Sequence, residues 1–587
     1  MCDEKCKKHD FSALKASGKA LNSYFRVFKC NCGIMGKTIR VLCLNTNKYE
    51  LFPMGSTVKD VYMKMAAEVL PNAIAARVNN KTVSLHFELY KPKQIEFINT
   101  YSSSGMRAYV RTLTFVLSAA VSELYPGCQF KLEHPVSKGY FCVLNLGRPT
   151  EPDDLLAIKK RVQELIHSNY PIEFVEEETS VMVEMFRERG RMDIVDLLTT
   201  QGSLYSGYFR MGEHIDYYYG ALAVSSGYLN LFDITAYFDG LLLQIPNRSN
   251  PTILQDIEFQ PKLLGVFKEY LNWNRIMSLN NVGDLNKTCL NGESTNLINI
   301  SESLQEKKIA HIADAIDQRK KVRMVLISGP SSSGKTTFAK RLAIQLMVLG
   351  MKPVAISLDN YFVDRDLTPR DVKGNFDFES LYALDLELFN QHLKALLLGE
   401  EVETPVFNFA LGKKEFKGDK LKLTEQTVLI LEGIHALNPN LLPDIPLDVQ
   451  YKVYVSALTS MSLDDHNWIP TTDNRLLRRI IRDFRYRGYS AKDTISRWES
   501  VREGEEKWIF PYQENADAMF NSALIFEFSV LRGYAEPILR QVPQNCPEYA
   551  EAHRLLRFVE YFQPISDPEI PPTSLLREFL GGSSFRY

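Results

Sequence analysis

The sequence lacks any long hydrophobic run. No stretch approaches the roughly eighteen uninterrupted apolar residues of a membrane-spanning helix. Residues 1–30 also lack the apolar centre of a secretory signal peptide. We therefore expect a protein with no membrane segment, located in the cytoplasm.

An excess of charge of either sign is also absent. The formal net charge is −2 at pH 7, with 69 Lys and Arg against 71 Asp and Glu. This balance gives the chain as a whole no attraction for nucleic acid or an anionic membrane, so any such contact would need a local patch.

The cysteines do not form a disulfide framework. They number nine, an odd total spread through a chain without an export signal, which is typical of reduced thiols. Only Cys2, Cys6, Cys30 and Cys32 cluster, and their spacing matches no strong zinc pattern. The sequence leaves open whether these four bind a metal.

What is present indicates several folded domains. The chain has 587 residues, 45% hydrophobic and 24% charged, which fits a globular protein of roughly four domains. After an N-terminal extension over 1–36, the pattern predicts a hairpin, and then a helix entered at Ser56 or Thr57. A long helix starting near Ser102 opens a mixed α+β stretch that runs to about residue 246, and a helical connector spans 251–320.

From residue 322 onward, short apolar runs alternate with helical patterns. Such alternation predicts an α/β domain, with a parallel sheet flanked by helices, over 321–587. Ligands of such sheets bind beyond the carboxyl ends of the strands, so the residues at those ends are the candidates for a site.

The first of these strands is followed by a GxxxxGK[ST] motif and then by a predicted helix. Backbone N–H groups of such a loop surround phosphate oxygens; Lys335 would reach the β and γ phosphates, and the Thr336 hydroxyl would ligate Mg²⁺. The motif therefore predicts a site for ATP and Mg²⁺, the alternative being a tight turn without a nucleotide. Its residues are Gly329, Pro330, Ser331, Ser332, Ser333, Gly334, Lys335, Thr336 and the adjoining Thr337.

Carboxylates follow two further strands. Asp359 would accept the proton of an attacking hydroxyl or hold a metal-bound water, although a loop or helix-capping aspartate is the alternative. Glu432 ends the strand TVLILEG, where a carboxylate would face the same cleft and bind Mg²⁺.

Arginines line one face of a downstream helix. Arg475, Arg478, Arg479 and Arg482 stand at i, i+3, i+4 and i+7. Guanidinium groups suit phosphate oxygens, so we interpret this face as a phosphate clamp rather than a solvated surface.

The motifs SGPSSSGKTT, SLDNYF, GNFDF, PVFNF, ILEGIHALN and DNRLLRRIIRDFRYRG resemble, in order and spacing, those of the uridine kinase and phosphoribulokinase family over roughly 322–530. The resemblance implies that Asp359 is the catalytic base and that Glu432 binds Mg²⁺. It also implies roles in catalysis for Lys335, Arg478 and Arg482, and in ATP binding for Arg487. The acceptor site would comprise Tyr361, Phe376, Phe407, Arg475 and Asp377, the last holding ribose hydroxyls.

The acceptor motifs depart from the family pattern. Uridine kinases usually carry Pro-x-Tyr-Asp-Phe followed by a histidine, whereas this chain has Pro405-Val-Phe407-Asn408-Phe409. The family's Phe-Asp-His-Pro is here Phe376-Asp377-Phe378-Glu379. A nucleoside acceptor and another small alcohol, such as a sugar phosphate or a pantothenate-like molecule, both remain open.

The N-terminal half resembles other modules. Residues 37–97, with LFPMGSTVKDV and AIAARVNNKTVSL, resemble the β-grasp TGS domain, and 102–246, with LSAAVSELYPG, resemble the editing domain of threonyl-tRNA synthetases. The four positions of the editing chemistry here read Arg111, Phe115, Tyr218 and Leu222, none of which replaces imidazole or thiolate. We expect no editing activity, but a regulatory or docking role, for which a nucleotide, an RNA end and the kinase domain itself are the alternative partners.

Two functions from different classes follow. The first is an ATP-dependent, Mg²⁺-requiring kinase of a small-molecule acceptor, foremost a nucleoside. The second is a regulatory or RNA-binding protein that senses ATP without turnover, and Asp359 favours the kinase because a sensor needs no base aimed at an acceptor. Homo-oligomer formation is left open.

Overall fold

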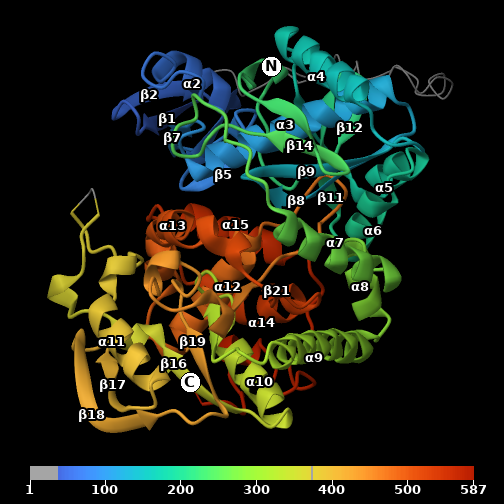
Figure 1. The fold of residues 1–587 in the computed structure, drawn as a ribbon. Helices are drawn as coiled ribbons and strands as arrows, with labels where there is room; N and C mark the ends of the chain where they lie inside the picture. The colour runs from blue at the N-terminus through green and yellow to red at the C-terminus, as the bar shows by residue number, and fades with distance from the viewer. Residues whose placement is uncertain (1–36, 372–373, 587) are drawn as a thin grey trace, which may run out of the picture.

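The computed structural model describes residues 37–371 and 374–586. Figure 1 shows the N-terminal half in the upper part of the view and the C-terminal half below it, with connector helices between them. The four cysteines that cluster near the N-terminus lie outside the described residues.

A five-stranded mixed sheet with the order β2-β1-β7-β4-β5 begins the described chain. The predicted hairpin is confirmed, because β1 and β2 pair antiparallel. The predicted helix is α2, which Thr57 caps through a hydrogen bond from the Asp60 N–H. The bounds are β1 Thr38–Cys43, β2 Lys48–Pro53, β3 Ser56–Thr57, α2 Val58–Met65, β4 Ala75–Val78, β5 Lys81–Val83, β6 Glu88–Leu89 and β7 Lys93–Ile98.

The helix predicted from Ser102 is α3, which is buried along most of its length because its side chains are apolar or small. A four-stranded antiparallel sheet, β13-β14-β9-β8, and a three-stranded sheet, β10-β11-β12, complete this part. The bounds are α3 Ser103–Leu124, β8 Gln129–Val136, β9 Gly139–Asn145, α4 Pro152–His167, β10 Glu173–Glu178, α5 Thr179–Glu188, α6 Met192–Gln201, β11 Tyr205–Met211, β12 His214–Asp216, β13 Asp233–Tyr237 and β14 Gly240–Gln244.

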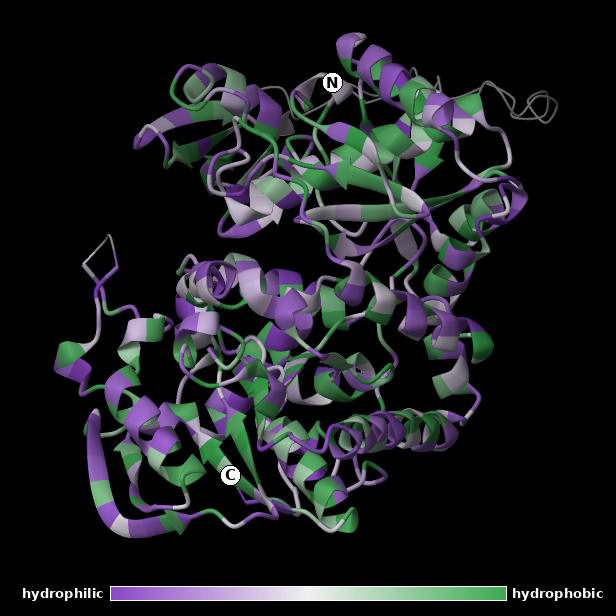
Figure 2. Ribbon diagram, viewed as in Figure 1, coloured by the Kyte–Doolittle hydropathy of each residue, from purple (hydrophilic) through white to green (hydrophobic). Residues whose placement is uncertain are grey.

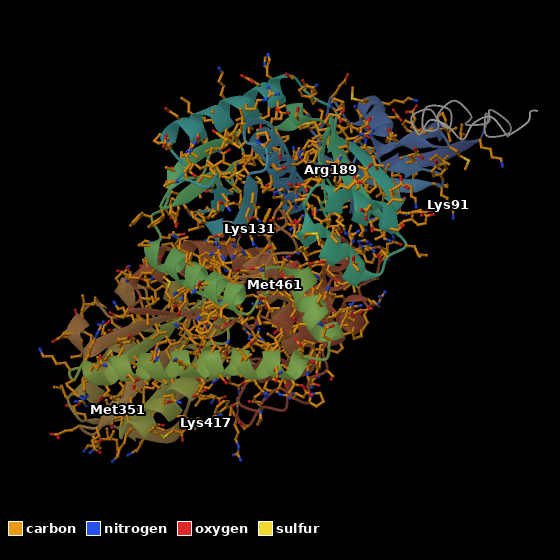
Figure 3. All side chains as sticks on the ribbon, turned by 90° about the vertical axis from the view of Figure 1, so that its right-hand side faces the viewer. Lys91, Lys131, Arg189, Met351, Lys417 and Met461 are labelled. Carbon is orange, nitrogen blue, oxygen red and sulfur yellow. The ribbon has the colours of Figure 1, made fainter. Side chains whose placement is uncertain are left out.

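The connector is helical, as the sequence predicts. It consists of α7 Pro261–Ile276, α8 Val282–Leu290 and α9 Ser294–Gln318. Figure 3 shows these helices along the side that faces the viewer, between the upper half with Lys131 and the lower half with Met351 and Lys417.

The C-terminal half is an α/β unit around a parallel five-stranded sheet with the order β16-β19-β15-β20-β21. Its central strands are apolar and buried on both faces (Figure 2), as expected for parallel strands between helices. The bounds are β15 Met324–Ser328, α10 Lys335–Val348, β16 Lys352–Ser357, α11 Leu386–Leu397, β17 Glu401–Asn408, β18 Lys413–Lys422, β19 Thr427–Glu432, β20 Gln450–Ser456, α12 Thr471–Tyr486, α13 Ala491–Trp508, β21 Ala518–Asn521, α14 Glu527–Leu539, α15 Tyr549–Val559 and α16 Arg577–Leu580.

The two halves share one hydrophobic core. Phe186 of α5 and Leu198 of α6 belong to the same buried cluster as Leu477 of α12 and Phe558 of α15. The arginine-bearing helix α12 is therefore packed against the N-terminal half through its apolar side, which leaves its other side for the cleft of the α/β unit.

Buried charges reinforce this junction. Arg107 of α3 forms an ion pair of 2.9 Å with Glu551 of α15, and Arg554 of α15 pairs at 2.6 Å with Asp473 in the first turn of α12. Burial by itself would raise the pKa of the Glu551 carboxyl. The positive charges of Arg107 and Arg554 outweigh this effect and lower that pKa to about 2. The chain of ion pairs links the N-terminal half to the start of α12.

Candidate functional site

The loop between β15 and α10 has the backbone of a phosphate cradle. Gly329 has room only for hydrogen, because a Cβ there would lie 1.9 Å from the carbonyl oxygen of Val455. Gly334 adopts a φ of 83° as the residue before α10, a conformation that favours glycine. The first turn of α10 then presents unpaired backbone N–H groups at the end of the buried strand.

The polar side chains of this loop fit a phosphate ligand. The hydroxyls of Ser332 and Ser333 are buried and have no hydrogen-bond partner in the structure. Lys335 Nζ donates to the carbonyl oxygen of Pro330 at 3.3 Å and lies 4.0 Å from Glu432 Oε1. Phosphate oxygens would satisfy both the hydroxyls and the ammonium group.

Thr336 and Glu432, the two residues expected to bind Mg²⁺, lie close together. Thr336 Oγ1 lies 3.5 Å from Glu432 Oε2, and Glu432 is the last residue of β19. Among the described residues no group of three or more His, Cys, Asp or Glu side chains is arranged to hold a metal ion. Mg²⁺ commonly binds one or two protein ligands and completes its shell with phosphate oxygens and water, so this pair is sufficient.

Asp359 lies just beyond β16, in the short 3₁₀ helix Leu358–Tyr361. Desolvation raises its pKa, and the positive charges of Lys335, Arg487 and Arg482 partly offset that rise. Asp359 is therefore within electrostatic reach of the lysine of the loop and of two arginines of the α12 region. Such a carboxylate is placed to accept a proton beside a group that carries phosphate.

Two of the predicted arginines lie in buried ion pairs, which corrects the expectation that their guanidinium groups are free to hold phosphate, although Arg475 also donates to the carbonyl oxygen of Ser331 in the loop at 3.2 Å. Arg475 is 1% exposed and pairs with Glu505 of α13, and Arg478 is fully buried and pairs with Glu527 of α14. Both guanidinium groups are bidentate in these pairs, so their hydrogen-bonding edges are occupied by carboxylates. Their role is to hold α12 against the neighbouring helices.

The other three predicted arginines form a group of their own, and one of them contacts the loop. We call Arg479, Arg482 and Arg487 the arginine cluster, because all three surround the buried carboxylate of Asp483. Arg479 also donates a hydrogen bond of 2.7 Å to Ser331 Oγ in the phosphate loop. Three guanidinium groups around one carboxylate leave excess positive charge next to the phosphate loop, where a polyphosphate would neutralise it.

A family model described as "Phosphoribulokinase / Uridine kinase family" matches residues 324–525. A uridine kinase from Halobacterium salinarum is 30% identical over 193 residues, which are 32% of this chain and 76% of that kinase. The chain belongs to the phosphoribulokinase and uridine kinase family. A uridine kinase from Anoxybacillus flavithermus is 28% identical over 34% of this chain and 85% of its own length.

Membership of the phosphoribulokinase and uridine kinase family makes the C-terminal half an ATP-dependent phosphotransferase domain for a small alcohol. The fold and the position of the loop agree with this assignment, because the nucleotide loop follows the central strand β15. No helix in the described part of the chain is long and apolar enough to cross a membrane.

A cavity of about 270 Å³ is lined in part by Arg479 and Arg487 of the arginine cluster. Phe407, one of the residues that the resemblance assigns to the acceptor site, also lines it. The cavity also shows residues that the sequence analysis missed, because they come from four separate segments that meet only in the fold. They are Phe362, Arg365, Phe378, Phe409, Tyr489 and Arg497, and the lining also includes Arg479 and Arg487, which the sequence analysis had identified.

Other predicted acceptor residues lie elsewhere. Tyr361 is buried in the core and its hydroxyl is 3.1 Å from His392 Nδ1, so the expectation of substrate contact is corrected for this residue. Phe376 packs under the guanidinium group of Arg370, 4.2 Å from the ring centroid. Asp377 is half-buried and its backbone N–H donates to the carbonyl oxygen of Pro369.

The N-terminal half is similar to threonyl-tRNA synthetases. A threonine–tRNA ligase from Syntrophotalea carbinolica is 28% identical over 187 residues, which are 32% of this chain and 29% of that ligase. The chain thus covers less than a third of the ligase, and the similarity concerns the N-terminal part.

Packed side chains fill the region that corresponds to the editing site. Phe115 and Tyr218 form an edge-on ring pair 6.0 Å apart, and Leu222 is fully buried. Arg111 lies over the ring of Tyr219 at 4.6 Å. The neighbouring His214 bonds to Ser118, and burial lowers its pKa to about 4.

Proposed function

We propose that this protein transfers the γ-phosphate of ATP to a hydroxyl of a nucleoside or a related small alcohol. The observation that carries the proposal is the phosphate loop between β15 and α10, which leads into Lys335 and accepts a hydrogen bond from Arg479 at Ser331, with Asp359 placed just beyond β16 of the same sheet. A protein that only sensed ATP would not need a carboxylate that can accept the proton of an acceptor hydroxyl.

The chain's own residues account for the main chemical needs of this transfer. Asp359 would accept the proton of the acceptor hydroxyl as its oxygen attacks phosphorus. Lys335 and the arginine cluster would balance the charge of the transferred phosphoryl group, and the backbone N–H groups of the loop would hold the other phosphates. Thr336 and Glu432 would hold Mg²⁺, which supplies further charge neutralisation on the phosphate oxygens.

The acceptor cavity supports a ring-shaped acceptor. Its aromatic side chains offer faces for a base or sugar, and Arg365 and Arg497 add positive charge away from the phosphate loop. A nucleoside is the acceptor that we propose first, with a sugar phosphate or a pantothenate-like alcohol as the alternatives.

The decisive experiment is a panel of acceptors with ATP and Mg²⁺, read out as ADP formation and as phosphorylated product. Lys335→Ala should abolish transfer, because it removes the charge on the β and γ phosphates. The exposed Lys352→Ala, at the start of β16, is the matched control and should transfer normally. ATP binding without transfer to any acceptor would instead support the sensor, and wild-type turnover by Lys335→Ala would refute the loop assignment.

We further propose that the N-terminal half has kept a synthetase-related fold without its editing chemistry. The buried Phe115, Tyr218 and Leu222 leave no group to activate water. In this proposal 37–97 is a TGS-like module and 102–246 an editing-like module that dock on the kinase or contact RNA or a nucleotide.

A further inference from the structure

The segment before and within α16 packs onto the nucleotide loop. Leu575 belongs to the hydrophobic cluster of β15 and α10, and its Cδ2 atom would lie 3.2 Å from a Cβ built on Gly334. Leu576, Phe579 and Leu580 are at most 2% exposed, so the apolar side chains of the segment are buried in the protein. A portion of the chain more than 230 residues beyond the loop thus covers the start of α10.

The carboxylate of Glu578 occupies a phosphate-binding position of this loop. Its Oε2 atom accepts a hydrogen bond from Thr337 Oγ1 at 2.6 Å and a longer one from the Thr337 backbone N–H at 3.4 Å. Thr337 is the third residue of α10, where the helix dipole and the unpaired N–H groups attract anions. In a P-loop, these first-turn N–H groups and those of the loop surround the α and β phosphates.

The Glu578 carboxylate also adds negative charge close to Glu432, one of the residues expected to bind Mg²⁺. A carboxylate that sits beside the Mg²⁺ residues therefore competes with the phosphate for donors while adding negative charge to the site.

We propose that Glu578 and its segment act as an intramolecular competitor of the nucleotide. The inference rests on the proposed ATP-binding function. ATP would bind only to molecules in which the Glu578 carboxylate has left Thr337. The apparent affinity for ATP is then the affinity of these open molecules multiplied by the fraction of the protein that is open. Any partner that held the C-terminal segment away from the loop would then activate the kinase.

The test is titration of ATP, with Mg²⁺ present, into the full-length wild type, Glu578→Gln and Glu578→Ala. Both variants should bind ATP about tenfold more tightly, because the competing charge is lost. Glu569→Gln is the matched control, since this exposed glutamate lies in the same C-terminal region and bonds to Thr295. Its affinity should equal that of the wild type.

A second measurement does not depend on variants. In the wild type, hydrogen exchange of the backbone amides in 574–581 should become faster when saturating ATP is added. Unchanged or slower exchange, or equal ATP affinity in the wild type and both Glu578 variants, would overturn the inference. Complete absence of ATP binding would overturn it as well.

These outcomes separate the inference from the proposed function. If the Glu578 variants bind ATP more tightly but phosphorylate none of the acceptors, competition stands and phosphoryl transfer fails. If the wild type phosphorylates an acceptor and the Glu578 variants bind ATP as the wild type does, the kinase stands and competition fails.

Discussion

Arg478 and Glu527 form a bidentate ion pair in which neither side chain is exposed to solvent. Arg478 also donates to Ser522, whose hydroxyl in turn bonds to the carbonyl oxygen of Ser333 in the phosphate loop. The pair therefore fixes α12, α14 and the loop relative to one another.

Arg478→Ala should destabilise the protein strongly, because it leaves the Glu527 carboxylate buried without its partner. We expect a loss of about 3–5 kcal/mol in the free energy of unfolding. Denaturant unfolding at neutral pH measures this loss. A change below about 1 kcal/mol would show that the pair does not hold the helices together.

Arg479→Ala should lower catalytic activity and leave stability nearly unchanged. Arg479 is half-buried and reaches the loop through Ser331, so the fold should survive while charge stabilisation of the transferred phosphoryl group is lost. We expect kcat to fall by about 10² to 10³, with an unfolding transition close to that of the wild type. Comparison of kcat and unfolding in both arginine variants checks the division between structural and phosphate-facing arginines.

Asp359→Asn should lower kcat by about 10² to 10⁴ with little change in ATP affinity, because the amide cannot accept the proton of the acceptor. Steady-state kinetics and a direct ATP titration measure the two quantities. If ATP affinity falls and turnover per bound ATP is unchanged, Asp359 serves the metal and the base lies elsewhere.

Glu379 should make stability depend on pH. Desolvation, with Glu505 adding to it, raises its pKa from 4.5 to about 7. Between these values the folded state holds a proton that the unfolded state has lost, so stability falls as pH rises and is constant above about pH 7. Glu379→Gln has no carboxyl group at this position, so the variant should not show this loss of stability as pH rises.

The variant should therefore be more stable than the wild type at pH 8.5 by on the order of 1–3 kcal/mol, and the difference should shrink towards pH 4.5. Denaturant unfolding of the wild type and of Glu379→Gln at pH 8.5 and pH 4.5 measures this difference in the free energy of unfolding. An equal difference at both pH values would show that the charge of Glu379 is not responsible.

The N-terminal half should not deacylate seryl-tRNA, because Phe115, Tyr218 and Leu222 cannot activate water and His214 is buried and bonded to Ser118. A deacylation assay with the full-length protein measures the rate against tRNA alone. Hydrolysis by the wild type that is lost in Tyr218→Ala would place an active site there.

Much of the local structure could be predicted from the sequence. The pattern around Thr57 and Ser102 predicted where α2 and α3 begin, since capping is decided by the side chain and its next three residues. The strands β15 and β19 were equally clear, because a continuous apolar run between turn signals indicates a strand buried on both faces. The same local logic identified the loop at Gly334 and Lys335.

The arginines show where such reasoning stops. Arg475, Arg478, Arg479 and Arg482 share one helical face in the sequence, but a guanidinium group pairs with whatever carboxylate the fold brings to it. Glu505 and Glu527 come from later helices and take two of the four. No pattern within α12 distinguishes those two from the ones that face the phosphate loop.

The sequence by itself determined the elements and the motif of the kinase half, because periodicity, caps and the phosphate loop depend on neighbours a few residues apart. Only the tertiary structure decided which arginines face the loop, which aromatic side chains line the acceptor cavity, and that Glu578 lies on Thr337. These are contacts between residues tens to hundreds of positions apart, and they depend on how buried helices from both halves pack around α12.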